Sequence, residues 1–249
     1  MTTLFRVTFG LLVVLSALPS SAEEKKAWGV NCSIDYKSSY LLSIGIRATK
    51  DAEPVMQSVC ALWHRSGLYG GVWASQSLTH PGSDKSLANE VDYFVGWSGR
   101  PFKEVPLRLT LDLEYYDLAN PSLFDWKGDM FDANVRLAYE KWVRLTPFAE
   151  VHYLGETDAT SFESGWYVTG GMLGSIPLHR RLEWRLRADF THRWDLGMES
   201  AQFLGGRSSL AWKINNHITL RVPEVRGIYP LQSENEKFFA VGVGIDFKF

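Results

Sequence analysis

Long apolar runs are missing from this sequence after residue 22, and none of the later ones reaches the ~18 residues that a membrane-spanning helix needs. An excess of either charge is missing too, because 26 lysines and arginines face 28 aspartates and glutamates. That balance argues against nucleic acid as a partner and against a polybasic membrane-surface role. Any association with a membrane must therefore come from another kind of structure.

Cysteine is scarce, with only Cys32 and Cys60 in the chain. An exported protein meets an oxidising compartment, in which a disulfide is permitted. If two paired strands turn near residue 50, however, Cys32 lies much farther from the turn than Cys60 does, which favours two buried or wall-packed thiols. The patterns CxxC, HExxH and DxDxDG do not occur, so we expect no metal site and no cofactor.

The first 22 residues read as a cleavable export signal. Arg6 supplies positive charge, residues 7–18 are apolar, and residues 20–22 are small, as a cleavage site requires. The prediction is a signal peptide over residues 1–22 and one domain over residues 23–249, exported through the inner membrane of a Gram-negative cell.

The last twelve residues alternate strictly between apolar and polar or small side chains. One face of an extended strand collects the side chains of Phe239, Val241, Val243, Ile245, Phe247 and Phe249. An apolar strand that ends on an aromatic residue resembles the closing strand of an outer-membrane β-barrel. Phe247 and Phe249 are accordingly predicted to form a membrane-insertion signal for the barrel-assembly machinery.

Short extended runs separated by polar, Gly- and Pro-bearing segments favour a meander of neighbouring strands. Strands are expected at 29–46, 55–65, 68–77, 89–97, 106–116, 129–140, 146–154, 164–176, 182–195, 203–213, 217–229 and 238–249. Short and long connections largely alternate, as in barrels with short periplasmic turns and long outer loops. The predicted fold is an all-β, closed, antiparallel up-and-down transmembrane barrel of about twelve strands. A soluble all-β protein is the alternative.

Alternation is clearest in three strands, where leucines, valines and aromatic residues share one face and charged residues the other. The apolar faces carry residues such as Leu111, Val135 and Trp184, and the aromatic residues fall toward strand ends, as interfacial belts require. Pro223 interrupts one strand and predicts a bulge there, because proline cannot donate a ladder hydrogen bond.

If the charged faces point inward, the lumen holds both signs of charge. The predicted lumen-lining residues are Arg108, Asp112, Glu114, Asp132, Arg136, Glu183, Arg185, Arg187, Asp189, Arg207 and Arg221. These side chains either line a passage with a transverse field or neutralise one another in ion-pair ladders. Four of them, Arg185, Arg187, Arg207 and Arg221, favour carboxylate or phosphate solutes, because a guanidinium group is a planar fork of donors.

The segments SGLYGGVWASQ at 66–76, EVDYFVGWSG at 90–99 and SSYLLSIGI at 38–46 resemble, in order and spacing, those of the Gcw_chp family, the TorF-like porins. The chain departs from that family where an Arg-Gly step is replaced by Ser43-Ile44. The resemblance implies an outer-membrane barrel with a channel role and implies no catalytic residue.

The sequence thus predicts an outer-membrane channel for small polar, including anionic, solutes, surrounded by outer-membrane lipid and without enzymatic activity. A non-conducting barrel that serves as a scaffold or maintains the envelope is the first alternative, and Trp126 in a long connection is the residue that would serve it. A lipid-directed acyl hydrolase is the second. His152 and His192 are its only wall-placed histidines, and no nucleophile motif accompanies them.

Overall fold

The computed structural model describes residues 27–42, 44–45, 47–48, 53–81, 88–118, 129–142, 144–157, 163–194, 196, 199–232 and 236–249. The predicted signal at 1–22 and Trp126 lie outside this part of the chain. Among the described residues, no helix has the length and apolarity needed to cross a bilayer.

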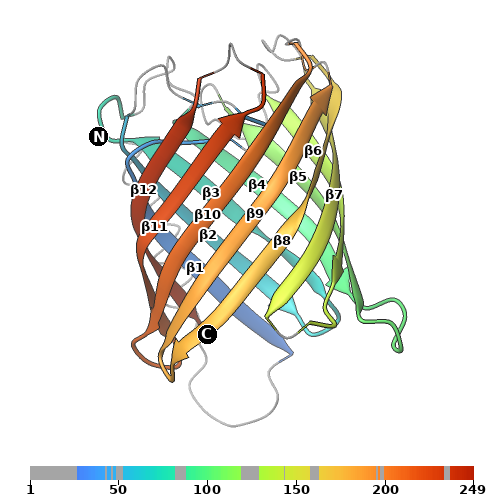
Figure 1. Ribbon diagram of the computed structural model, residues 1–249, viewed down its shortest axis with the longest axis vertical. Helices are drawn as coiled ribbons and strands as arrows, with labels where there is room; N and C mark the ends of the chain where they lie inside the picture. Colours follow the sequence, from blue (N-terminus) through green and yellow to red (C-terminus); the bar gives the residue numbers. More distant parts are fainter. Residues whose placement is uncertain are drawn as a thin grey trace.

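Twelve strands make up the described structure. They are β1 (Trp28–Lys37), β2 (Val55–His64), β3 (Leu68–Ser77), β4 (Glu90–Gly99), β5 (Leu107–Asp117), β6 (Met130–Tyr139), β7 (Leu145–Glu156), β8 (Gly165–His179), β9 (Leu182–Trp194), β10 (Ala201–Lys213), β11 (Ile218–Pro230) and β12 (Phe238–Lys248). Each strand pairs antiparallel with its sequence neighbours, and β1 pairs with β12, so the sheet closes on itself (Figure 1). The prediction of a closed twelve-stranded antiparallel barrel is confirmed.

The two ends of the barrel differ in their connections. One end, here the turn end, holds the start of β1, the end of β12 and the connections 65–67, 100–106, 140–144, 180–181 and 214–217. The opposite end, the loop end, holds the connections 38–54, 78–89, 118–129, 157–164, 195–200 and 231–237. All connections longer than seven residues therefore lie at the loop end.

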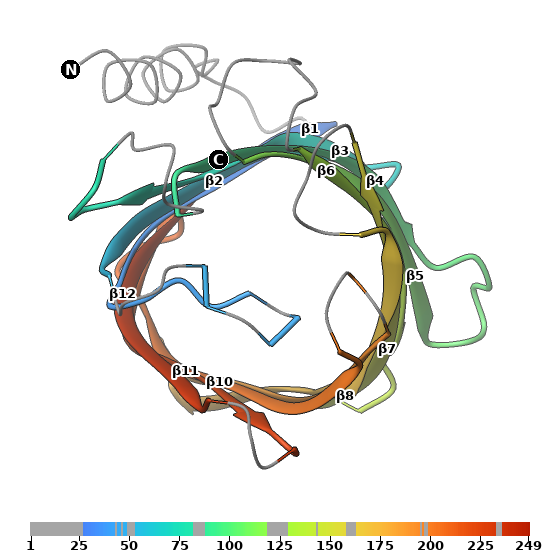
Figure 2. The ribbon, with the colours of Figure 1, turned by 90° about the horizontal axis from the view of Figure 1, so that it is seen from above.

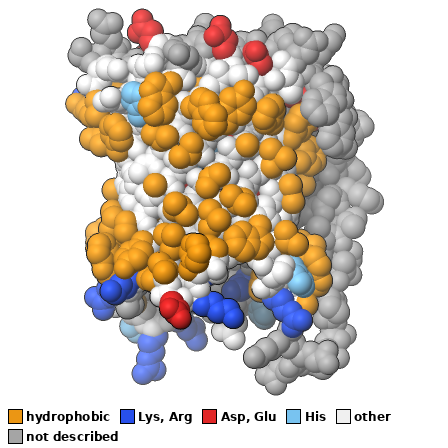
Figure 3. All heavy atoms as spheres, turned by 90° about the vertical axis from the view of Figure 1, so that its right-hand side faces the viewer, with side chains coloured by type: hydrophobic (Ala, Val, Ile, Leu, Met, Phe, Trp, Pro, Cys, Tyr) orange, Lys and Arg blue, Asp and Glu red, His pale blue; other side chains and the backbone are white. Residues whose placement is uncertain are grey.

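The outward face of the wall is apolar. Leu113 is 50 % exposed, Val135 45 %, Trp184 37 % and Phe239 64 %, and all four belong to the faces that the alternation assigned to the outside. Hydrophobic side chains cover the height of the wall and are densest in two bands near its ends (Figure 3). Exposed tryptophans at or beside strand ends include Trp28, Trp142, Trp166, Trp194 and Trp212.

The expected first strand, 29–46, is too long. β1 ends at Lys37, and the chain then turns into the barrel instead of continuing along the wall. The apolar residues after Lys37 resemble a strand continuation in the sequence. Tyr40, Leu41 and Ile44 are nevertheless buried, and this part of the chain lies inside the ring of strands (Figure 2).

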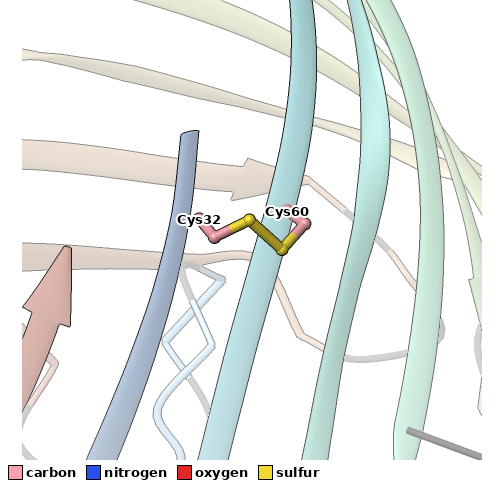
Figure 4. The surroundings of a disulfide bond; sticks show 2 residues. All are labelled: Cys32 and Cys60. Atoms are coloured by element: carbon pink, nitrogen blue, oxygen red, sulfur yellow. A yellow bond between two sulfur atoms is a disulfide. The ribbon is translucent and has the colours of Figure 1, made fainter. Parts of the chain in front are cut away.

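The early end of β1 also corrects the expectation for the cysteines. Cys32 lies directly opposite Cys60 in the β1–β2 ladder, and the two form a disulfide (Figure 4). A connection of 17 residues, 38–54, absorbs the chain that the prediction had placed in strand. The argument for two free thiols was therefore wrong because it put the turn near residue 50.

The irregularity predicted at Pro223 is present. The β11–β12 register shifts between Arg221 and Glu224, as a bulge requires. Arg221 and Glu224 consequently both face inward, although an unbroken alternation would place residues three apart on opposite faces.

Candidate functional site

The chain between β1 and β2 enters the barrel at the loop end. Residues 38–42, 44–45 and 47–48, here the inner loop, include a bridge between Leu41 and Arg47 and a hydrogen bond from the Ala48 amide to the Tyr40 carbonyl, at 3.0 Å. Gly45 adopts a φ of +83°, and a side chain there would overlap the ring of Phe203. Figure 2 shows this segment, in blue, inside the ring of strands.

Apolar contacts of the inner loop reach three sectors of the wall. Leu41 packs with Ala201, Phe203, Ile228 and Ala240 of β10 to β12. Ile44 packs with Met130, Leu154 and Tyr167 of β6 to β8 and with Leu196. Tyr40 and Ala48 pack with Val55 of β2 and with Ala88. The inner loop therefore crosses the lumen.

Polar contacts fix the inner loop at three further points. The Arg193 guanidinium donates to the Ile44 carbonyl at 2.9 Å, and that of Arg226 donates to the Leu41 carbonyl. On the opposite wall the Tyr40 hydroxyl donates to Glu90 at 2.8 Å. Because these bonds come from β9, β11 and β4, they hold the loop from several sides.

The predicted lumen-lining residues all lie on the inward face, as the strand registers show. The carboxylates of the inward face are concentrated on β4 to β6, here the acidic sector, which also holds Arg108 and Arg136. The arginines are concentrated on β9 to β11, here the basic sector, which also holds Glu183 and Asp189. The β4 to β6 sector carries the carboxylates of Glu90, Asp92, Asp112, Glu114 and Asp132. The β9 to β11 sector carries Arg185, Arg187, Arg193, Arg207, Arg221 and Arg226. Sequence analysis missed Arg193 and Arg226 as contacts of the inner loop, because it placed residues 38–46 in the wall.

The acidic sector is tied to tyrosines and a histidine. Asp132, 2 % exposed, accepts hydrogen bonds from the hydroxyls of Tyr116 at 3.3 Å and Tyr167 at 3.2 Å. His152 Nδ1 lies 2.8 Å from Asp132 Oδ2, and its ring stacks on that of Tyr167 with 4.1 Å between centroids. Glu150 lies 3.9 Å from the other ring nitrogen.

These contacts bear on the hydrolase alternative. The partners of His152 among the described residues are carboxylates and a tyrosine, and no serine hydroxyl is among them. His192 contacts the edge of Trp194, with 4.1 Å between ring centroids. Neither histidine activates a serine in this arrangement.

Three of the six arginines of the basic sector, Arg185, Arg187 and Arg221, pair with carboxylates. Arg221 contacts Asp35 at 2.5 Å, Asp246 at 2.9 Å, and Glu224. Arg187 contacts Asp189 at 2.6 Å and Glu150 at 3.1 Å. Both arginines therefore belong to networks of ion pairs across the inner wall.

Two other predicted arginines, Arg185 and Arg136, have longer ion pairs. Arg185 lies 3.3 Å from Glu183 and 3.4 Å from Asp246, and Arg136 lies 3.4 Å from Glu150. Near the turn end, hydrogen bonds from Arg108 and Arg100 hold the pKa of Glu140 below its usual range.

Arg207 is different from its neighbours. Its side chain is exposed within the lumen, and it has no ion pair with any described residue. It lies directly opposite Arg226 in the β10–β11 ladder. Arg207 is thus an exposed arginine of this sector without a carboxylate partner among the described residues.

Glycines on the inward face make the ion pairs possible. Gly244 of β12 lies between Arg221 of β11 and Asp35 of β1, and a methyl group on it would overlap the Asp35 carboxylate and crowd the guanidinium group. Charged side chains can therefore meet across an intervening strand.

At the closing strand, Phe247 faces outward opposite Cys32 in the register. The Phe249 amide donates to the Val30 carbonyl at 2.9 Å, and its ring stacks on His217 with 6.0 Å between centroids. Within the described residues, no group of three or more histidine, cysteine, aspartate or glutamate side chains is arranged to hold a metal ion.

The fold is similar to that of outer-membrane channels. The KdgM porin aligns with a TM-score of 0.58 over 88 % of this chain and 99 % of its own, at 7 % identity. The NanC porin gives 0.55 over 88 % and 100 %, at 9 % identity. The COG4313 outer membrane channel from Pseudomonas putida F1 gives 0.52 over 94 % and 100 %, at 9 % identity.

Sequence comparison adds no relative. No family model matches the chain, and no curated protein matches it. The resemblance to the Gcw_chp family therefore stays a prediction, while the likeness to porin-type barrels rests on structure.

Proposed function

We propose that this chain is an outer-membrane channel for passive diffusion of small polar solutes, and that the inner loop forms its constriction. The observation that carries the proposal is a closed barrel whose outside is apolar and whose lumen is lined by both acidic and basic side chains. Only a closed barrel satisfies all backbone groups of a sheet in hydrocarbon. The relation to the Gcw_chp family, carried by the segments around residues 38–46, 66–76 and 90–99, belongs to the same proposal.

Solute preference is proposed to be weakly anionic. Arg207 is exposed on the inward face and has no carboxylate partner in the described part of the chain, and its planar donors suit carboxylate and phosphate groups. The other three arginines predicted to favour anions, Arg185, Arg187 and Arg221, are held in ion pairs, so the preference depends on one group and should be modest. The KdgM porin, which shares the fold, has been solved in complex with disordered oligogalacturonate.

The test is conductance in planar bilayers. The purified protein should give discrete single-channel steps, and a salt gradient should give a reversal potential of anionic sign. A variant in which residues 40–48 are replaced by a short Gly-Ser linker should give larger steps, because the inner loop crosses the lumen. A wild-type protein that stays silent and a linker variant that stays silent too would contradict the channel.

A second candidate, the non-conducting scaffold barrel, is favoured by the same inner loop. Three apolar clusters and three polar contacts hold the loop across the bore, as expected of a plug. Silence of the wild type together with conduction by the linker variant would identify a permanently plugged barrel.

Insertion is proposed to proceed through the barrel-assembly machinery, which would recognise the closing strand. Phe247→Ala and Phe249→Ala should lower the amount of folded protein in outer-membrane fractions, with Phe239→Ala on the same face as the control. Equal yields for all three variants would contradict a specific role of the final aromatic residues.

A further inference from the structure

Exposed basic side chains surround the turn end of the barrel. The five connections there contain seven lysines and arginines but only two acidic residues, Glu104 and Glu140. The loop-end connections contain eleven acidic and five basic residues. The two ends of the barrel thus carry opposite charge, and Figure 3 shows blue side chains below the lower apolar band and red ones above the upper band.

Six of the turn-end residues have no ion pair with any described residue. These six, here the turn-end cations, are Arg65, Lys103, Lys141, Arg144, Arg180 and Arg181, and all six are exposed. By contrast, Arg100 in the same region is held by Glu140 at 2.6 Å. The turn-end cations therefore present net positive charge to whatever lies outside the barrel.

The same connections expose large apolar side chains. Phe102 is 62 % exposed next to Lys103, and Trp142 is 54 % exposed next to Lys141. Leu178, at the end of β8 before Arg180 and Arg181, is 52 % exposed. Tryptophan and phenylalanine in this setting favour the boundary between hydrocarbon and headgroups, where a neighbouring ammonium or guanidinium group is at the depth of the phosphates.

We propose that the turn-end cations form a binding surface for the headgroups of anionic phospholipids. The inference rests on the membrane location in the proposed function but is independent of conduction, because a plugged barrel would bind the same lipids. Guanidinium groups contact phosphate in a bidentate manner, and the cations recur in four of the five connections, so lipids would be bound around the barrel.

The arrangement favours lipid over a protein or a polysaccharide. Cations spread around a rim and interleaved with exposed Phe102, Trp142 and Leu178 match a layer that surrounds the barrel. A soluble acidic partner would need a compact patch, and it would leave these apolar side chains in water. Adjacent basic residues and apolar anchors are the pattern by which proteins recognise anionic leaflets.

The experiment compares lipid enrichment around the reconstituted barrel. The protein is placed in nanodiscs of phosphatidylcholine with a minor fraction of phosphatidylglycerol, and the lipid retained after detergent extraction is quantified. The wild type should enrich phosphatidylglycerol about threefold to tenfold over the bulk ratio. Because charge screening is strong at about 0.5 M salt, the enrichment should fall steeply there.

Two matched variants separate charge from folding. Neutralising four cations together, Lys141→Gln, Arg144→Gln, Arg180→Gln and Arg181→Gln, should remove most of the enrichment. Converting the three arginines of this set to lysine keeps the charge and should retain most of it. Lys237→Gln, at the loop end, should leave it unchanged.

Several results would overturn the inference: equal lipid enrichment by the wild type and the neutralised variant, displacement of the lipid by soluble glycerol phosphate, or retention on sedimented peptidoglycan in preference to anionic vesicles. Failure of the chain to insert into any nanodisc is a different result. That outcome would refute the membrane location itself and hence the proposed function.

Discussion

Release of the inner loop should follow from removing the arginines that hold it. Arg193→Met and Arg226→Met keep most of the aliphatic side chain but delete the donors to the carbonyls of Ile44 and Leu41. A hydrogen bond to a charged group stabilises by about 1.5–3 kcal/mol. Taking about 2 kcal/mol, each substitution should raise the ratio of displaced to seated loop about 30-fold.

The apolar contacts set the limit of that effect. Leu41, Ile44 and Tyr40 remain buried in their three clusters, and each buried side chain contributes about 1.5–3 kcal/mol. Single variants should therefore keep the loop seated most of the time and show brief openings. If the two contacts are independent, the double variant should raise the ratio of displaced to seated loop by the product of the two single increases. A larger increase would show that the contacts are coupled.

Single-channel recording is the assay, with open probability and step size as readouts. Arg185→Met is the control, because this residue lies on β9 with Arg193 but pairs with Glu183 and Asp246 and not with the inner loop. Unchanged open probability and unchanged step size in the double variant would refute the role assigned to Arg193 and Arg226.

Three further predictions concern stability and selectivity. Cys32→Ser with Cys60→Ser should lower the free energy of unfolding by about 3–4 kcal/mol, measured by denaturant titration in detergent, because the bond closes a 28-residue separation; no change in the midpoint would contradict this. Gly244→Ala should shift the same midpoint downward by about 2 kcal/mol or more through overlap with the ion-paired side chains, whereas Gly206→Ala, whose added carbon meets its nearest neighbour at 3.9 Å, should change it little. Arg207→Gln should move the reversal potential toward cation preference, and an unchanged potential would show that this guanidinium does not set selectivity.

The strands were predictable because their alternation is a local property. The faces assigned to residues 106–116, 129–140 and 182–195 are those of β5, β6 and β9, with leucines and aromatics outside. Two-residue periodicity is enough to predict a strand and its outward face wherever one face meets water or charge and the other meets hydrocarbon. Strand ends were placed within a few residues for the same reason, apart from β1.

The inner loop was not predictable in this way. Tyr40, Leu41 and Ile44 are apolar and follow a strand, so the sequence reads as its continuation, and only the distant wall residues that they contact distinguish the two cases. The disulfide was misjudged as a consequence. Likewise, alternation placed Arg185, Arg187, Arg207 and Arg221 on the inward face, but which of them meets a carboxylate depends on neighbours up to 186 residues away, as for Arg221 and Asp35.

The contact between Arg221 and Asp35 also bears on how the barrel closes. β1 and β12 join the two ends of the chain through seven register pairs, fewer than any other neighbouring strands share. Before β1 and β12 pair, the sheet is open and Asp35 is distant from Arg221. The ion pair between Arg221 and Asp35, which passes over Gly244, can form only once β1 and β12 have paired. It therefore stabilises the closed barrel and not the open sheet.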